Sequence, residues 1–185
     1  MKRFIFATSN DHKVMIAQDV CDEAGIEFER KDADFLEIQS DNAEEIALNK
    51  VRQAYEEFNE PVAVTDDSWI IPGLNGFPGP YMKYMNQWLK PQDFLNLTKD
   101  LEDRRAIMRQ VIAYKDKDTE KVFSADIEAI LLKEARGKTN ISHFAVVSFD
   151  GGKHSMAEDE LTRIQAISKI DNSWHQLCEW LQQMW

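Results

Sequence analysis

Residues 4–13 read Phe-Ile-Phe-Ala-Thr-Ser-Asn-Asp-His-Lys, and this stretch decides the fold class. The apolar run Phe4–Ala7 predicts a short buried strand, and the polar residues after it predict a turn with helix-capping side chains. A helix is expected next, with its end at Gly25. The apolar face of that helix comprises Val14, Ala17, Val20, Cys21 and Ala24.

The junction between this strand and this helix is a candidate anion site. Backbone amides and the positive end of the helix dipole would face an anion there, and Lys13 adds a full charge in the first helical turn. An ordinary capped junction accounts for the same residues, and most such turns are of that kind.

Strand and helix patterns alternate along the rest of the chain, which indicates a mixed α/β protein. Residues 72–91 are rich in Gly and Pro and predict a structured loop that leads into a short helix. The expected helices run from Asp41 or Asn42 to Phe58, around Tyr81 to Leu89, and from Ser173 to Trp185. The expected strands are Pro61–Val64, Ala106–Tyr114, Val122–Leu132 and Phe144–Phe149.

Composition excludes several classes of protein. The chain has 185 residues, of which 43% are hydrophobic, and this is enough apolar surface to form a core. Its net charge of -11 repels a phosphate backbone, so we expect no nucleic-acid partner. We see no membrane span and no signal-peptide core. The two cysteines, Cys21 and Cys178, are far apart in sequence and argue against a disulfide framework, so the expected location is a reducing cytoplasm.

Lys50 lies inside the apolar stripe of the helix expected to end at Phe58. Its stem is expected to point toward the core, where a charged side chain needs a reason. Two interpretations remain open: the ammonium group extends to the edge of the stripe, or it faces a phosphate in a cleft.

Two adjacent carboxylates, Asp66 and Asp67, follow the strand expected over residues 61–64 and lie at its C-terminal end. Open α/β sheets place their chemistry at this end. Adjacent strand residues point to opposite faces, so we expect one of the two to be the working acid unless the backbone turns there. A solvated acidic turn is the other interpretation, and it is the more frequent one.

Together, these residues resemble the inosine triphosphate pyrophosphatase family, the Ham1-like enzymes that act on non-canonical purine nucleoside triphosphates. The resemblance runs through nearly the whole chain, with its motifs in family order. The motifs are Thr8-x-Asn10-x-x-Lys13, Glu37, Lys50, Asp66-Asp67-Ser68 and Gly76–Tyr81. Each is weak alone, and their common order makes the set specific.

The resemblance implies a single domain over residues 1–185. It implies an α/β fold with a long twisted mixed sheet flanked by helices, and two lobes with a cleft between them. It further implies a hydrolase that uses magnesium to convert a nucleoside triphosphate to a monophosphate and pyrophosphate. Such an enzyme binds a small nucleotide, has no nucleic-acid or membrane partner, and is usually a homodimer.

The phosphate-binding residues follow from the same resemblance. Thr8, Asn10 and Lys13 match the triphosphate-binding turn. Lys50 matches a second cationic contact to phosphate, and Ser68 matches a substrate contact.

The catalytic and metal-binding residues are also implied by the resemblance. Glu37 and Asp67 match the magnesium ligands, and Asp67 also matches the general base. Asp66 matches an acidic neighbour that assists the metal. Magnesium suits such a sparse set because it takes carboxylate and phosphate oxygens and keeps several waters.

The half of the chain that would recognise the base departs from the family's pattern. Phe144 stands where the family has an aspartate, Ile164 where it has a lysine, and Lys169-Ile170 where a histidine and an arginine follow a serine. A pocket without its hydrogen-bonding groups cannot discriminate strongly for its former partner. We therefore expect altered or relaxed base specificity.

Three functions remain open. The favoured one is a magnesium-dependent nucleoside triphosphate pyrophosphatase whose changed base pocket draws on His143, Phe144, Lys169 or Trp69, although packing alone also accounts for His143 and Phe144. The second is a non-catalytic nucleotide-binding or regulatory protein, against which the retained carboxylates and lysines argue. The third is a hydrolase of another phosphoanhydride, such as a modified nucleotide, a dinucleotide or a sugar nucleotide.

Overall fold

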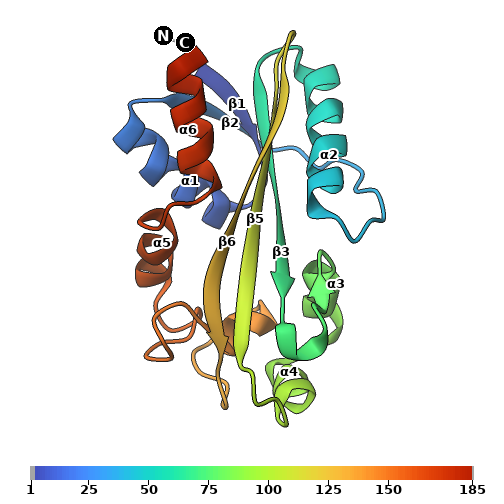
Figure 1. Ribbon diagram of the computed structural model, residues 1–185, viewed down its shortest axis with the longest axis vertical. Helices are drawn as coiled ribbons and strands as arrows, with labels where there is room; N and C mark the ends of the chain where they lie inside the picture. The colour runs from blue at the N-terminus through green and yellow to red at the C-terminus, as the bar shows by residue number, and fades with distance from the viewer. Residues whose placement is uncertain (1–2, 185) are drawn as a thin grey trace. The chain divides into compact units, whose positions relative to one another are not determined.

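A computed structural model describes residues 3–184, without the side chains of residues 160–163, and confirms the α/β class (Figure 1). A seven-stranded sheet has the order β2-β1-β3-β5-β6-β7, with β4 paired to β3. The strands are β1 (Arg3–Ala7), β2 (Glu27–Lys31), β3 (Val62–Ile70), β4 (Pro78–Gly79), β5 (Arg105–Lys115), β6 (Glu120–Leu131) and β7 (Val147–Ser148). The helices are α1 (Asp11–Ala24), α2 (Ala43–Phe58), α3 (Met82–Trp88), α4 (Pro91–Thr98), α5 (Glu160–Ser168) and α6 (Ser173–Met184), with 3-10 turns η1 (Pro72–Leu74) and η2 (Ser142–Ala145).

The chain folds into two compact units. The first comprises Met1–Asp67, Gln110–Ala125 and Ser168–Trp185, and the second comprises Ser68–Arg109 and Asp126–Ile167. Strands β3, β5 and β6 therefore contribute residues to both units. Among the described residues, no helix is long and apolar enough to cross a membrane.

One face of the strands in the first unit packs against α2. Ile5 of β1 and Val62 and Val64 of β3 share a buried cluster with Ala47 and Val51 of α2. The spacing of two between Val62 and Val64 is that of residues on one face of a strand. Burial of this apolar stripe holds α2 on the sheet.

The opposite face of the same strands packs against α1 and α6. Phe6 points away from the Ile5 side, and its ring meets that of Trp174 on α6 at a centroid distance of 4.8 Å. Helix α1 lies beside α6, where the sulfur atoms of the free thiols Cys21 and Cys178 are 3.7 Å apart. Figure 1 shows α2 on one side of these strands and α1 and α6 on the other.

The second unit is built from the connection between β3 and β5 and from the chain after β6. Strand β3 pairs with β4 in antiparallel fashion, with Trp69 opposite Gly79, and β6 pairs with β7, with Ile130 opposite Ser148. The buried Trp69 ring packs at 5.9 Å from that of Phe149.

Two of the expected strands are wrong in extent. Strand β3 does not end before the acidic pair but continues to Ile70, because Asp66 and Ser68 are buried and held within the sheet. The strand expected over Phe144–Phe149 is replaced by the turn η2 and the two-residue strand β7. The other expected elements are confirmed to within two residues at each end, and Trp185 lies outside the described residues.

Candidate active site

Short polar side chains build the turn between β1 and α1. Asn10 caps α1, because its Oδ1 accepts hydrogen bonds from the amides of His12 at 3.0 Å and Lys13 at 3.4 Å. The amide of Asn10 in turn donates to Thr8 Oγ1 at 3.2 Å. The predicted phosphate-binding residues Thr8, Asn10 and Lys13 are therefore parts of one hydrogen-bonded turn.

Two backbone amides of this turn have donor capacity left. The amides of Ser9 and Asp11 donate no hydrogen bond within the described part of the chain. They lie at the N-terminus of a 14-residue helix, whose dipole places partial positive charge there. Amides and dipole together form the arrangement that binds anions at helix N-termini.

Lys13 and Asp67 form the first ion pair of the site. Lys13 Nζ lies 3.2 Å from Asp67 Oδ2, with only 22% and 23% of the two side chains exposed. The other oxygen, Asp67 Oδ1, and the hydroxyl of Thr65 are buried, and neither has a hydrogen-bond partner among the described residues. Thr65 and Asp67 are two residues apart on β3 and point to the same face. Buried acceptors without partners are costly, so this face holds polar capacity that a ligand can satisfy.

Lys50 is the centre of a second charged group. Its Nζ lies 3.0 Å from Glu37 Oε1, 3.3 Å from Asp66 Oδ1 and 3.4 Å from the carbonyl oxygen of Thr65. The Lys50 side chain is 14% exposed, so its charge is paired inside the fold rather than extended into water.

Burial and charge compete at this group. Burial raises the pKa of the Asp66 carboxyl above its ordinary value, and the opposing attraction of Lys50 and Lys13 does not reverse the shift. Burial also acts to lower the pKa of Lys50, but Asp66 and Glu37 outweigh it and hold that pKa above its ordinary value. Lys50 is therefore a fixed cation at neutral pH.

The two charged groups meet β3 from different helices but remain electrostatically coupled, because Lys13 and Asp67 both act on the pKa of Asp66. Asp66 contacts Lys50 of α2, whereas Asp67 contacts Lys13 of α1, as the alternation of strand residues requires. Glu37 is in the same charged group as Asp66, because both carboxylates pair with the Lys50 ammonium. Ser68, the next residue of β3, is buried and is the first residue of the second unit.

The charges of the site fit a divalent cation. Glu37, Asp66 and Asp67 carry more negative charge than Lys13 and Lys50 neutralise, so a triphosphate needs a further cation to bind there. The described residues contain no group of three or more His, Cys, Asp or Glu side chains suited to a metal. Magnesium does not require one, because it keeps waters and takes phosphate oxygens. The buried Asp67 Oδ1, which has no partner, is a ligand of the right chemistry.

Comparison with known proteins accords with this geometry. Residues 4–180 match the sequence model of the Ham1 family. The chain belongs to the Ham1 family. Among the relatives of this Ham1 chain, the dITP/XTP pyrophosphatase of Hyperthermus butylicus is 31% identical over 179 residues, or 97% of this chain and 94% of the relative. The dITP/XTP pyrophosphatase of Methanopyrus kandleri is 32% identical over 179 residues, or 96% of this chain and 95% of the relative.

Solved structures share the fold of this Ham1 chain. A HAM1 protein from Coxiella burnetii matches with a TM-score of 0.79 and 22% identity, over 99% of this chain and all (100%) of that one. The Staphylococcus aureus Ham1 protein matches with a TM-score of 0.77 and 21% identity, over 100% of each chain.

The Ham1 chain has an aromatic cluster where the base-recognition motif was expected. In the second unit the ring of His143 lies 5.1 Å from that of Trp69 and 4.8 Å from that of Phe144. The Nδ1 of His143 lies 3.0 Å from Asn86 Oδ1, which also accepts from the His143 amide at 3.2 Å. His143 is thus anchored by Asn86 as well as packed, and no motif in the sequence pointed to that partner.

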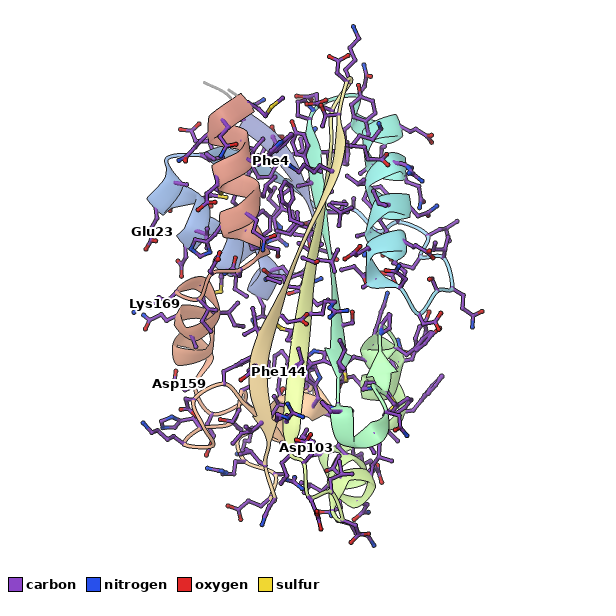
Figure 2. The ribbon with its side chains drawn as sticks, viewed as in Figure 1. Phe4, Glu23, Asp103, Phe144, Asp159 and Lys169 are labelled. Carbon is purple, nitrogen blue, oxygen red and sulfur yellow. The ribbon has the colours of Figure 1, made fainter. Side chains whose placement is uncertain are left out.

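The remaining substituted positions are in different surroundings. Ile164 is buried in the second unit, whereas Lys169 and Ile170 of the first unit are exposed. Figure 2 shows the Lys169 side chain pointing outward. The described contacts therefore join Trp69, His143 and Phe144 but not Lys169.

One residue of the phosphate side was missed from the sequence. The hydroxyl of Thr65 lies on the Asp67 face of β3 and has no partner among the described residues. Its spacing of two from Asp67 would place both side chains on one face of a strand. This inference requires a strand that continues past residue 64, which the sequence did not predict.

Proposed function

We propose that this chain hydrolyses a nucleoside triphosphate to a nucleoside monophosphate and pyrophosphate. The observation that carries the proposal is the ion pair between Lys13, at the start of α1 beside the turn with free amides, and Asp67 of β3, whose buried Oδ1 has no partner among the described residues. The relatives named dITP/XTP pyrophosphatase supply the reaction class.

In this proposal the phosphates are bound by the turn and the lysines. The free amides of Ser9 and Asp11 and the ammonium groups of Lys13 and Lys50 bind phosphate oxygens, while Ser68 contacts the substrate. Positioning and charge stabilisation supply most of the catalysis in phosphoryl chemistry, so a nucleophilic side chain is not needed.

Asp67 is the general base of the proposed reaction. It orients a water molecule and accepts its proton as the water oxygen bonds to phosphorus. The bond between the α and β phosphates breaks, and pyrophosphate leaves. Asp66 supports this step by fixing the position of the Lys50 ammonium group.

We propose magnesium as the cofactor, with Glu37 and Asp67 as its protein ligands. When bound, the metal neutralises phosphate charge and lowers the pKa of a coordinated water. Excess chelator should abolish turnover, and added magnesium should restore it. Turnover that persists in excess chelator would overturn the metal requirement.

We propose relaxed base specificity, centred on Trp69, His143 and Phe144. Support comes from the substitution of Phe144 for the family's aspartate and from the aromatic cluster around it. The test is a comparison of kcat/KM for dITP, XTP, dUTP, ATP and GTP, and relaxed specificity predicts similar values. A preference for dITP and XTP above about a hundredfold would show that base selectivity is retained.

We also propose a homodimer in the cytoplasm. Tyr84 and Trp88 of α3 are 44% and 74% exposed, and they supply apolar surface for self-association. Light scattering should give about twice the chain mass of 21.5 kDa. A mass equal to that of one chain at micromolar concentration would exclude the dimer.

The reaction itself is tested by its products. Incubation of dITP with magnesium should release pyrophosphate and dIMP in equal amounts, with no free phosphate. Free phosphate instead would indicate a different bond. Metal-dependent nucleotide binding without any product would favour a regulatory protein, and cleavage of only a dinucleotide or sugar nucleotide would favour another phosphoanhydride hydrolase.

A further inference from the structure

Arg30 of β2 contacts the phosphate-binding turn from outside the motif residues. Its Nη1 donates to Asp11 Oδ1 at 2.7 Å, and its Nη2 donates to the carbonyl oxygen of Ser9 at 3.4 Å. Its Nε donates to Asp32 Oδ1 at 2.7 Å. The guanidinium thus binds the two residues whose amides are free to bind an anion.

The register of the sheet places Arg30 there. Strands β1 and β2 are parallel, with Phe6 opposite Arg30, and the Thr8 amide donates to the carbonyl oxygen of Lys31 at 2.9 Å. Because Phe6 faces α1 and α6, Arg30 faces the same side of the sheet. The residue is therefore fixed by two strands beside the N-terminus of α1.

The charge of Asp11 explains why the turn needs an arginine. A carboxylate in the first turn stabilises the helix, but here it lies beside the amides that would receive a phosphate, and its charge repels that ligand. The Asp11 side chain is 80% exposed, so Arg30 is its neutralising partner rather than part of a buried core.

We propose that Arg30 is a positioning residue for the triphosphate, a role that rests on the proposed function. It cancels the charge of Asp11 and holds the Ser9 carbonyl, so that the amides of the turn face an incoming phosphate. Arg30 acts through Asp11 and Ser9 and makes no contact with the reacting atoms.

A double-mutant cycle tests this role. Arg30→Met should raise KM for dITP about fivefold with kcat within about twofold, and Asp11→Asn alone should lower KM slightly. In the Arg30→Met/Asp11→Asn enzyme KM should recover most of the way to the wild-type value, because only the contact with the Ser9 carbonyl is then still missing. Arg30→Lys should recover part of the loss, since it retains the charge without the fork of donors.

Asp32 supplies the matched control. It contacts the same guanidinium but lies outside the turn, so Arg30→Met/Asp32→Asn should keep the raised KM. An unchanged KM in Arg30→Met, or equal recovery with Asp32→Asn and Asp11→Asn, would overturn the proposal. Lys13→Met is measured alongside. If neither Lys13→Met nor Arg30→Met changes KM, the proposed phosphate site is wrong. If Lys13→Met raises KM and Arg30→Met does not, only the proposed role of Arg30 is wrong.

Discussion

Lys50 keeps a full charge within the apolar stripe of α2 because two carboxylates meet it there. Replacement by methionine keeps the apolar stem and removes the charge. A buried carboxylate that loses a cationic partner is destabilising, because less of its desolvation is then offset. The proposed phosphate contact of Lys50 is therefore coupled to the stability of the strand beneath it.

Lys50→Met should raise KM for the triphosphate about tenfold or more, the loss expected for one charged hydrogen bond. It should also lower the free energy of unfolding by about 1–3 kcal/mol at pH 7. Burial already raises the pKa of Asp66, and this pKa would rise further without Lys50. A group with a raised folded pKa contributes its stability at low pH and loses it as the pH rises, so the deficit should shrink as the pH falls toward 4.

Urea unfolding across this pH range and steady-state kinetics measure both effects. Lys99→Met is the control, because that side chain is 67% exposed and lies 4.0 Å from Asp100. A wild-type KM in Lys50→Met would return Lys50 to a purely structural role.

At the scale of the element, the loop after β6 depends on one glycine. Gly137 has φ +79, and a Cβ there would lie 2.7 Å from the backbone carbon of Ala157. Backbone atoms cannot yield as a flexible side chain can. The loop and the segment that follows β7 are therefore locked together at this point.

Gly137→Ala should lower the free energy of unfolding by about 3 kcal/mol or more, from left-handed strain and the clash together. Gly25→Ala is the matched control. It has φ +68 and nothing within 4 Å of the added carbon, so it should cost only about 1 kcal/mol. Equal losses in urea unfolding would contradict the close approach of Gly137 to Ala157.

The turn after β7 depends on Asp150. Its Oδ1 accepts from Ser148 Oγ at 2.7 Å and from the amides of Lys153 at 2.9 Å and His154 at 3.0 Å. Although burial opposes the shift, these bonds and the His154 ring lower the pKa of the Asp150 carboxyl to about 2. The stabilisation is therefore present above the ordinary carboxyl pKa of about 4 and is lost as the pH falls toward 2.

Asp150→Asn should lower the free energy of unfolding by up to about 1 kcal/mol at pH 7, a modest value because solvent screens the site. Chemical unfolding at several pH values checks this. The difference from wild type should vanish between pH 4 and 2, and a difference that stays constant would contradict the account.

Local pattern predicted those elements whose burial follows a simple period. The stripe of α2 and the long pair β5 and β6 were predictable because apolar residues repeat regularly there. The sequence predicts too early an end for strand β3, because Asp66 and Ser68 are residue types typical of a turn. The acid inside the strand is explained by its ion-pair partner Lys50, which is distant in sequence. Strand β2, with sequence Glu-Phe-Glu-Arg-Lys, is too polar to be recognised as a strand without its partner β1.

The candidate site was predictable to a similar extent. The identities of its residues came from the motifs, but the division of Asp66 and Asp67 between two helices required the contacts with Lys50 and Lys13. Arg30 and Asn86 lie outside every motif, so only the register of β2 and the fold of the second unit reveal them.

At the scale of the whole molecule, the two units divide the proposed work. The proposed phosphate and metal residues, from Thr8 to Asp67, belong to the first unit, while Phe144 and Ile164 belong to the second. Base preference should therefore change without loss of phosphate chemistry. The single domain expected over residues 1–185 stays a prediction beside the two compact units that the structure shows.

Phe144→Asp restores the residue type that the resemblance implies. We expect kcat/KM for dITP relative to dATP to rise about tenfold, because a carboxylate can accept a hydrogen bond from N1–H of hypoxanthine, whereas N1 of adenine is itself an acceptor. Phe144 is only partly buried, so the change should leave the fold intact. Phe144→Leu is the control, and an unchanged ratio in Phe144→Asp would remove this position from base recognition.

The proposed role of Asp67 in hydrolysis is tested by the rate of pyrophosphate release from dITP with magnesium, compared between the wild type and Asp67→Asn. The substitution keeps the shape of the side chain and removes the base and its charge. We expect the wild type to release pyrophosphate, and Asp67→Asn to be slower by about a hundredfold or more with an unchanged circular dichroism spectrum. Release by Asp67→Asn at near the wild-type rate would contradict this role.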